Sequence, residues 1–126
     1  MYKTILVEKL IEDGAKLLEK LDDRGVPVTA SAWFYDPDRS AWQLVIVTPV
    51  AGMPGPLEAY MQIQASMTGL DLSFALSDIS VMSPQSRKFE EFKRTIEGAA
   101  GGARIKPKSP SEGIAFDDAY IYRWST

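Results

Sequence analysis

The sequence contains no cysteine, no histidine and no asparagine. The lack of cysteine excludes disulfide scaffolds, thiolate zinc sites and cysteine nucleophiles. The lack of histidine removes the commonest general base and the commonest metal ligand, and the lack of asparagine removes any acceptor for N-glycosylation. Any catalysis would therefore rely on carboxylates, Lys, Tyr, Ser or Thr, and we expect no cofactor.

Long apolar runs and an excess of positive charge are also missing. The longest apolar stretch begins at Leu44 and is broken by Pro49 and Pro54, far short of the roughly 18 residues that span a membrane. Fourteen Lys and Arg against 17 Asp and Glu give a net charge of −3, which argues against a non-specific nucleic-acid binder. No signal segment is recognisable at the start of the sequence. We expect a single domain over residues 1–126, located in the cytoplasm and not in a membrane.

The first part of the chain has the pattern of an amphipathic helix over residues 4–23. Leu10, Leu18 and other apolar residues recur at helical spacing, and charged residues take the opposite side. Gly14 falls on the apolar side, where glycine costs about 1 kcal/mol relative to alanine. It either permits a close approach by another group or is a tolerated boundary residue. Gly25 followed by Pro27 predicts the end of this helix.

A β-hairpin over residues 28–47 is the clearest prediction. Apolar and polar residues alternate on both sides of the turn sequence Asp36–Ser40. Pairing Tyr35 with Ala41 predicts a five-residue loop. That register places one set of side chains on a core-facing surface: Ala30, Ala32, Phe34, Trp42, Leu44 and Ile46.

Five further elements follow the hairpin in the predicted order. A helix over 56–68 has one stripe with Leu57, Tyr60 and Met61 and a second stripe with Ile63 and Met67, which is typical of a helix between layers or at an interface. A short strand covers 79–82, and Ser83 with Pro84 predicts the start of a third helix that ends near residue 97. Strands at 103–106 and 114–124 then form a second hairpin. The order α-β-β-α-β-α-β-β predicts an α+β domain with a mixed or mainly antiparallel sheet of 4–5 strands and three helices.

Two acids in the hairpin turn are the candidates for metal-dependent chemistry that we retain. Asp36 and Asp38 have the D-x-D spacing with which carboxylates hold a divalent cation. Pro37 lies between them, and aspartate is common in turns because it bonds to nearby backbone groups. The turn interpretation is favoured, and a small metal-dependent hydrolase or nucleic-acid-processing enzyme is kept as the alternative function.

Cations and aromatic residues near the end of the chain allow a weaker alternative. Arg104, Lys106 and Lys108 precede a strand in which Tyr120, Tyr122 and Trp124 alternate with other residues. Aromatic rings and cations on one sheet face can stack and hold single-stranded nucleic acid. The acidic composition argues against this function.

The favoured hypothesis is a non-enzymatic interaction or regulatory domain that forms a homo-oligomer or binds a protein partner. The second face of the predicted hairpin carries large side chains, and aromatic residues and Met are typical of interface cores. The predicted interface residues are Trp33, Tyr35, Gln43, Val45, Tyr60, Ile63 and Met67.

Several runs of the sequence also resemble a known group of proteins. These runs are VEKLIEDGAKLLEKLDDRGVPVTASAWFYD from Val7, then WQLVIVTP, GPLEAYMQIQ, DISVMSP and DDAYIYR. They resemble short bacterial proteins of unassigned function. The resemblance spans nearly the whole chain and implies a single domain of bacterial or phage origin, with no activity or catalytic residue to transfer.

Overall fold

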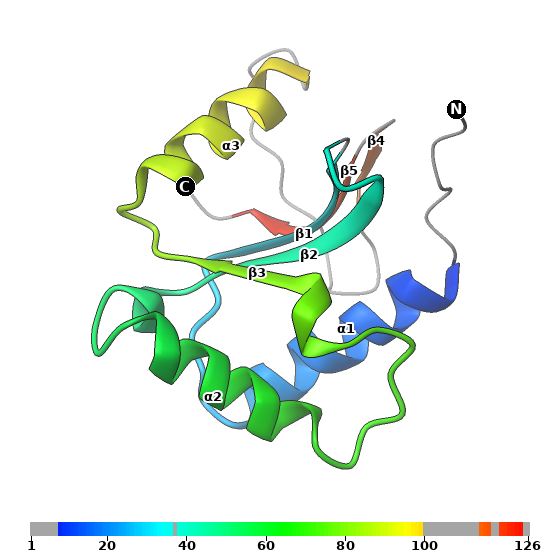
Figure 1. Ribbon diagram of the computed structural model, residues 1–126, viewed down its shortest axis with the longest axis vertical. Helices are drawn as coiled ribbons and strands as arrows, with labels where there is room; N and C mark the ends of the chain where they lie inside the picture. Colours follow the sequence, from blue (N-terminus) through cyan, green and yellow to red (C-terminus); the bar gives the residue numbers. More distant parts are fainter. Residues whose placement is uncertain (1–7, 37, 100–113, 117–118, 125–126) are drawn as a thin grey trace.

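The computed structural model describes residues 8–36, 38–99, 114–116 and 119–124. They form one mixed five-stranded sheet with three α-helices, in the predicted order α-β-β-α-β-α-β-β, which confirms the α+β class (Figure 1). The helices are α1 (Glu8–Asp23), α2 (Pro56–Met67) and α3 (Arg87–Ala99), and the strands are β1 (Ala30–Asp36), β2 (Ala41–Val47), β3 (Ile79–Met82), β4 (Ile114–Phe116) and β5 (Ala119–Trp124). Short 3₁₀ turns η1 (Pro49–Ala51) and η2 (Leu76–Asp78) flank α2 and its following loop.

The strands lie in the order β3-β2-β1-β5-β4, and only β2 and β3 run parallel. Helix α2 lies in the connection between these two strands, because a parallel pair requires a crossover. No helix in the described part of the chain is long and apolar enough to cross a membrane.

Both faces of the sheet are covered by helices (Figure 1). Helices α1 and α2 pack on one face, and α3 packs on the other. The first core contains Leu17, Leu18, Leu21, Trp33, Tyr35, Trp42, Leu44, Ile46, Ile63 and Tyr122, among others. The second core contains Ala30, Ala32, Val45, Val47, Phe89, Phe92 and Ile121. A sheet buried on both faces explains why β1 carries no charged residue before Asp36.

The predicted register of the β1–β2 hairpin is wrong by one residue. Asp36, not Tyr35, pairs with Ala41, so Tyr35 lies opposite Trp42 and Phe34 lies opposite Gln43. The loop is one residue shorter than expected, and Ser40 closes it in the left-handed region at φ 50°. A one-residue slip moves every side chain of a strand to the other face. The core that α1 and α2 cover therefore contains the large residues of β1, while its small residues face α3.

The start of α3 also differs from the prediction. The helix begins at Arg87, and its cap is Ser86, whose hydroxyl accepts a hydrogen bond from the backbone N–H of Phe89 at 3.1 Å. Ser83 instead accepts from the backbone N–H of Gln85 at 3.2 Å. Both residues stabilise a tight connection from β3 into the helix.

The C-terminal strands depart from the expected pairing as well. The segment predicted as one strand over 114–124 is two strands, β4 and β5, which pair with each other in antiparallel fashion. Strand β5 also pairs with β1, so it lies inside the sheet. The partner strand expected at 103–106 lies outside the described residues.

Candidate functional site

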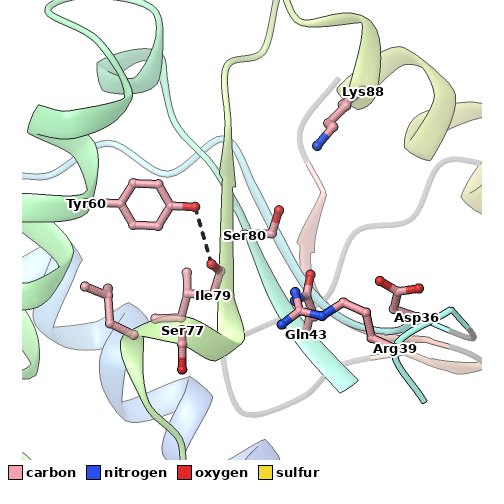
Figure 2. Close-up of a pocket in the computed structure, with 9 residues that line it drawn as sticks. Asp36, Arg39, Gln43, Tyr60, Ser77, Ile79, Ser80 and Lys88 are labelled. Carbon is pink, nitrogen blue, oxygen red and sulfur yellow. Dashed lines mark hydrogen bonds between the residues drawn. The ribbon is translucent and has the colours of Figure 1, made fainter. Parts of the chain in front are cut away.

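The described residues enclose an open groove of about 650 Å³ beside the β1–β2 turn and the edge strand β3. We call it the turn groove. Its lining comes from Asp36, Arg39, Gln43, Tyr60, Leu76, Ser77, Ile79, Ser80 and Lys88. Figure 2 shows Asp36, Arg39, Gln43, Ser80 and Lys88 on one side of β3 and Tyr60 on the other. The volume lies within the ~300–1,000 Å³ that is typical of small-ligand sites.

Strand alternation brings the polar members of the turn groove to one face of the sheet. Gln43 lies two residues before Val45, and Val45 pairs with Ser80 across the parallel β2–β3 ladder. Gln43 and Ser80 therefore project to the α3 side, beyond the area that the phenylalanines of α3 cover. Lys88, in the first turn of α3, reaches the same space.

Several groove side chains have no partner within the described part of the chain. Arg39, Gln43, Ser80 and Lys88 make no side-chain hydrogen bond or ion pair with any described residue. Asp36 uses one carboxylate oxygen, Oδ1, to accept from the backbone N–H of Asp38 at 3.0 Å. The groove thus contains two cations, one carboxylate and neutral donors and acceptors that are available to a ligand.

The bond between Asp36 and Asp38 is the local turn interaction that aspartate favours in such loops. In the described ranges no group of three or more acidic residues is close enough to hold a metal ion. Asp36 and Asp38 thus lie together in a turn, without a third carboxylate from the described residues. The metal-dependent alternative gains no support from this arrangement.

Tyr60 closes the outer edge of β3. Its hydroxyl donates to the carbonyl of Ile79 at 3.4 Å and accepts from the backbone N–H of Val81 at 3.3 Å (Figure 2 shows the first of these bonds). These two backbone groups are the ones that an added strand would bind. Tyr60, predicted as an interface residue, therefore occupies the pairing position of a neighbouring strand.

Most of the other predicted interface residues are buried inside the chain. Trp33 is 1% exposed, and Tyr35, Val45 and Ile63 are also buried, because helices cover both faces of the sheet. Met67 is half-buried against the first core, and Gln43 lines the turn groove. The surface expected on the hairpin does not exist in the form predicted, since it depended on the wrong register and on an uncovered face.

A buried hydrogen-bond cluster takes the place of that surface. Trp33 Nε1 donates to the Tyr122 hydroxyl at 2.8 Å and reaches the Leu10 carbonyl at 3.2 Å, while the Tyr122 hydroxyl donates to the Ile11 carbonyl. Burial raises the pKa of the Tyr122 phenol far above its ordinary value, so it remains a neutral donor.

The cluster depends on Gly14. A Cβ atom at this position would lie 2.3 Å from the Tyr122 hydroxyl oxygen and 2.9 Å from Trp33 Nε1. Of the two interpretations of Gly14, close approach is therefore correct. Two polar side chains from neighbouring strands contact the helix backbone where only glycine leaves room.

Asp13, on the same turn of α1, is fully buried and connects the helix to the loop before η2. Its carboxylate accepts from the backbone N–H of Ser73 at 2.8 Å and from Lys9 Nζ at 3.2 Å, and Lys16 Nζ lies 3.6 Å away. Burial would raise its pKa, but the hydrogen bonds from Ser73 and Lys9 outweigh burial and hold the pKa below 3.8. The carboxylate therefore ties a long loop to α1 in its ionised form.

Two of the aromatic side chains proposed for nucleic-acid binding, Tyr120 and Tyr122, lie on the sheet face that α1 covers. Tyr122 is buried in the cluster described above, and Tyr120 stacks edge-on against it with ring centroids 5.2 Å apart. Arg104 and Lys106, and the side chain of Trp124, lie outside the described residues. Tyr122 is therefore not available as a stacking surface.

The outer face of α2 carries the most exposed large apolar side chains of the described residues. Leu57 and Met61, one helical turn apart, are 74% and 54% exposed, and Met53 in the turn before the helix is 84% exposed. We call these three residues the α2 ridge. The two-stripe pattern predicted a helix that lies between layers or at an interface. Of the predicted interface residues on this helix, Ile63 is buried, whereas Leu57 and Met61 of the first stripe are exposed.

Comparison of the chain with models of protein families, with curated proteins and with solved structures found no match. The resemblance to short bacterial proteins therefore stays a prediction.

Proposed function

We propose that this protein is a non-enzymatic interaction domain that self-associates through the α2 ridge. The observation that carries the proposal is the exposure of Met53, Leu57 and Met61 within one short segment, whereas the other large apolar side chains of the described residues are mostly covered. Exposed clusters of Met and Leu are typical of interface centres, whereas single exposed apolar residues are common and need no explanation.

The charges around the ridge favour a second copy of the same chain as the partner. Between positions 40 and 86 the sequence has no Lys or Arg, and its only acids are Glu58, Asp71 and Asp78. Glu58 is half-buried and accepts a hydrogen bond from Gln62 Nε2 at 2.9 Å. Two α2 helices can therefore face each other with little like-charge repulsion, and a two-fold axis would place the same apolar side chains in contact.

The chemical composition of the chain supports a binding role over catalysis. It lacks the two side chains, Cys and His, that most often serve as nucleophile and general base. In the β1–β2 turn, the Asp36 carboxylate accepts a hydrogen bond from the backbone N–H of Asp38. The metal-dependent hydrolase remains the alternative to be tested by Mg²⁺ or Mn²⁺ titration, with no observation that favours it.

The test is light scattering after size exclusion, over a series of protein concentrations. The unmodified chain should give a mass that rises from one chain toward two as concentration increases. Leu57→Glu and Met61→Glu should remain single chains at every concentration, because each buries an unpaired charge in the interface. Both substituted side chains point into solvent in the single chain, so thermal unfolding at low concentration should be unchanged.

Arg94→Gln, on α3, is the matched control. Arg94 is exposed and lies on the opposite side of the sheet from α2, and its replacement changes the net charge by the same −1 as Leu57→Glu. This variant should associate like the unmodified chain. The proposal is refuted if the unmodified chain remains a monomer at all concentrations, or if the Leu57→Glu variant associates as the unmodified chain does.

A further inference from the structure

The turn groove gathers unpaired cations on a protein whose overall charge is negative. Arg39 comes from the β1–β2 turn and Lys88 from α3, two segments separated by almost fifty positions in the sequence, and both line the same groove. Neither side chain forms an ion pair with a described residue. Elsewhere in the described chain, Lys9, Lys16 and Arg123 have carboxylate partners. Arg24 and Arg87 form no ion pair with a described residue either, so the groove is distinguished by the two cations that line one hollow together.

The two cations have complementary chemistry for one type of anion. Arginine presents a planar set of donors that can bind two oxygens at once, and lysine adds a compact point charge. A phosphate monoester has three terminal oxygens and up to two negative charges, so it can engage both side chains together. A single carboxylate has only two oxygens and one charge.

The rest of the turn groove matches hydroxyl groups. Ser80 and Ser77 can donate and accept, and Gln43 offers both functions in one amide. The Oδ2 atom of Asp36 accepts no hydrogen bond from a described residue, so it can accept one from a ligand hydroxyl. Leu76 and Ile79 also line the groove, but they pack against the first core, on the other side of β3 from these polar groups.

We propose that the turn groove binds a small phosphorylated polyol of the sugar-phosphate class, with the phosphate between Arg39 and Lys88 and the hydroxyls on Asp36, Gln43 and Ser80. This site lies on the α3 side of the sheet edge, and it uses no residue of the α2 ridge. It therefore does not depend on self-association, and either proposal can fail alone.

The test is isothermal titration of the full chain with three probes: ribose 5-phosphate, ribose and inorganic phosphate. Ribose 5-phosphate should bind, ribose should not bind, and inorganic phosphate should bind at least tenfold more weakly than ribose 5-phosphate. Raising the salt concentration should weaken binding of ribose 5-phosphate, because the cations are exposed and their charges are screened.

Charge-neutralising variants test the assignment of residues. Arg39→Gln and Lys88→Gln should each lower the affinity for ribose 5-phosphate about tenfold, the effect of losing one charge-assisted hydrogen bond. Gln43→Ala should lower the affinity for ribose 5-phosphate without changing the affinity for inorganic phosphate. Arg94→Gln, on the same helix as Lys88 but outside the turn groove, is the control and should bind like the unmodified chain.

All four side chains are exposed or half-exposed, so the variants should fold, and thermal unfolding without ligand verifies this. Absence of binding to ribose 5-phosphate, equal affinity for inorganic phosphate, or unchanged affinity in the Arg39→Gln/Lys88→Gln double variant each overturns the proposal.

Discussion

Replacing Gly14 by alanine sets two physical effects against each other with opposite signs. Alanine is favoured over glycine inside a helix by about 1 kcal/mol, so helix propensity alone predicts a more stable protein. The structure predicts the reverse. The new Cβ would lie 2.3 Å from the Tyr122 hydroxyl oxygen and 2.9 Å from both Trp33 Nε1 and Tyr122 Cζ, so the Tyr122 ring or the helix must move.

The cost of that movement can be estimated from the bonds involved. Displacing the Tyr122 hydroxyl weakens its bonds to Trp33 and to the Ile11 carbonyl, and it leaves buried polar groups without partners. Overpacking costs about 1–3 kcal/mol and an unsatisfied buried group costs about as much again. After subtraction of the gain in helix propensity, Gly14→Ala should lower the free energy of unfolding by about 3 kcal/mol.

Urea unfolding followed by tryptophan fluorescence and by circular dichroism measures this loss. The double variant Gly14→Ala/Tyr122→Phe should lose less than the sum of the two single variants, since the phenol oxygen is the atom that clashes most. If Gly14→Ala is as stable as the unmodified chain or more so, the close approach of strand side chains to α1 is refuted.

Three further predictions concern other contacts. Asp13→Asn should lower the free energy of unfolding by about 1–2 kcal/mol at neutral pH. Because the folded pKa of Asp13 lies below 3.8, the unmodified chain should keep this contribution above that pH and lose it as the pH falls through the lowered pKa. The urea midpoints of the two chains should therefore converge in acid, and a constant difference between them would contradict the assignment. Tyr60→Phe should accelerate amide hydrogen exchange at Val81, because the N–H loses its partner, and unchanged exchange would show that the hydroxyl does not protect the edge. Phe92→Ala should lower stability by about 3 kcal/mol, as Phe92 packs edge-on against Phe34 with ring centroids 5.1 Å apart; a loss below about 1 kcal/mol would mean that α3 leaves that face largely open.

The order and type of the elements could be predicted because each has a strong local signal. The helical spacing of α1, the alternation in β1 and β2, and the glycines after α1 and α2 act over a few neighbouring residues. The register of the hairpin has no such signal. It depends on whether Ser40 adopts a left-handed conformation at φ 50°, a difference of a few tenths to 1 or 2 kcal/mol that packing across the sheet decides.

The functional surfaces were harder to predict for a related reason. The turn groove combines Arg39 and Lys88 with Ser80 from separate elements, so no continuous motif contains them. For the buried cluster, a signal was present, since Gly14 falls on an apolar helix face. The sequence could not identify Tyr122 and Trp33 as the side chains that approach it, because their pairing requires the order of β1 and β5 in the sheet.

The bond from Tyr60 to the rim of β3 makes helix position and sheet growth mutually dependent. An incoming strand can bond to the Ile79 carbonyl and the Val81 N–H only after the phenol has swung away, and the phenol belongs to α2. While α2 remains packed in place, Tyr60 therefore blocks another polypeptide from adding a strand to the β3 edge of the sheet. Any event that moves α2 away from β3 would also expose the unpaired Ile79 carbonyl and Val81 N–H to an incoming strand.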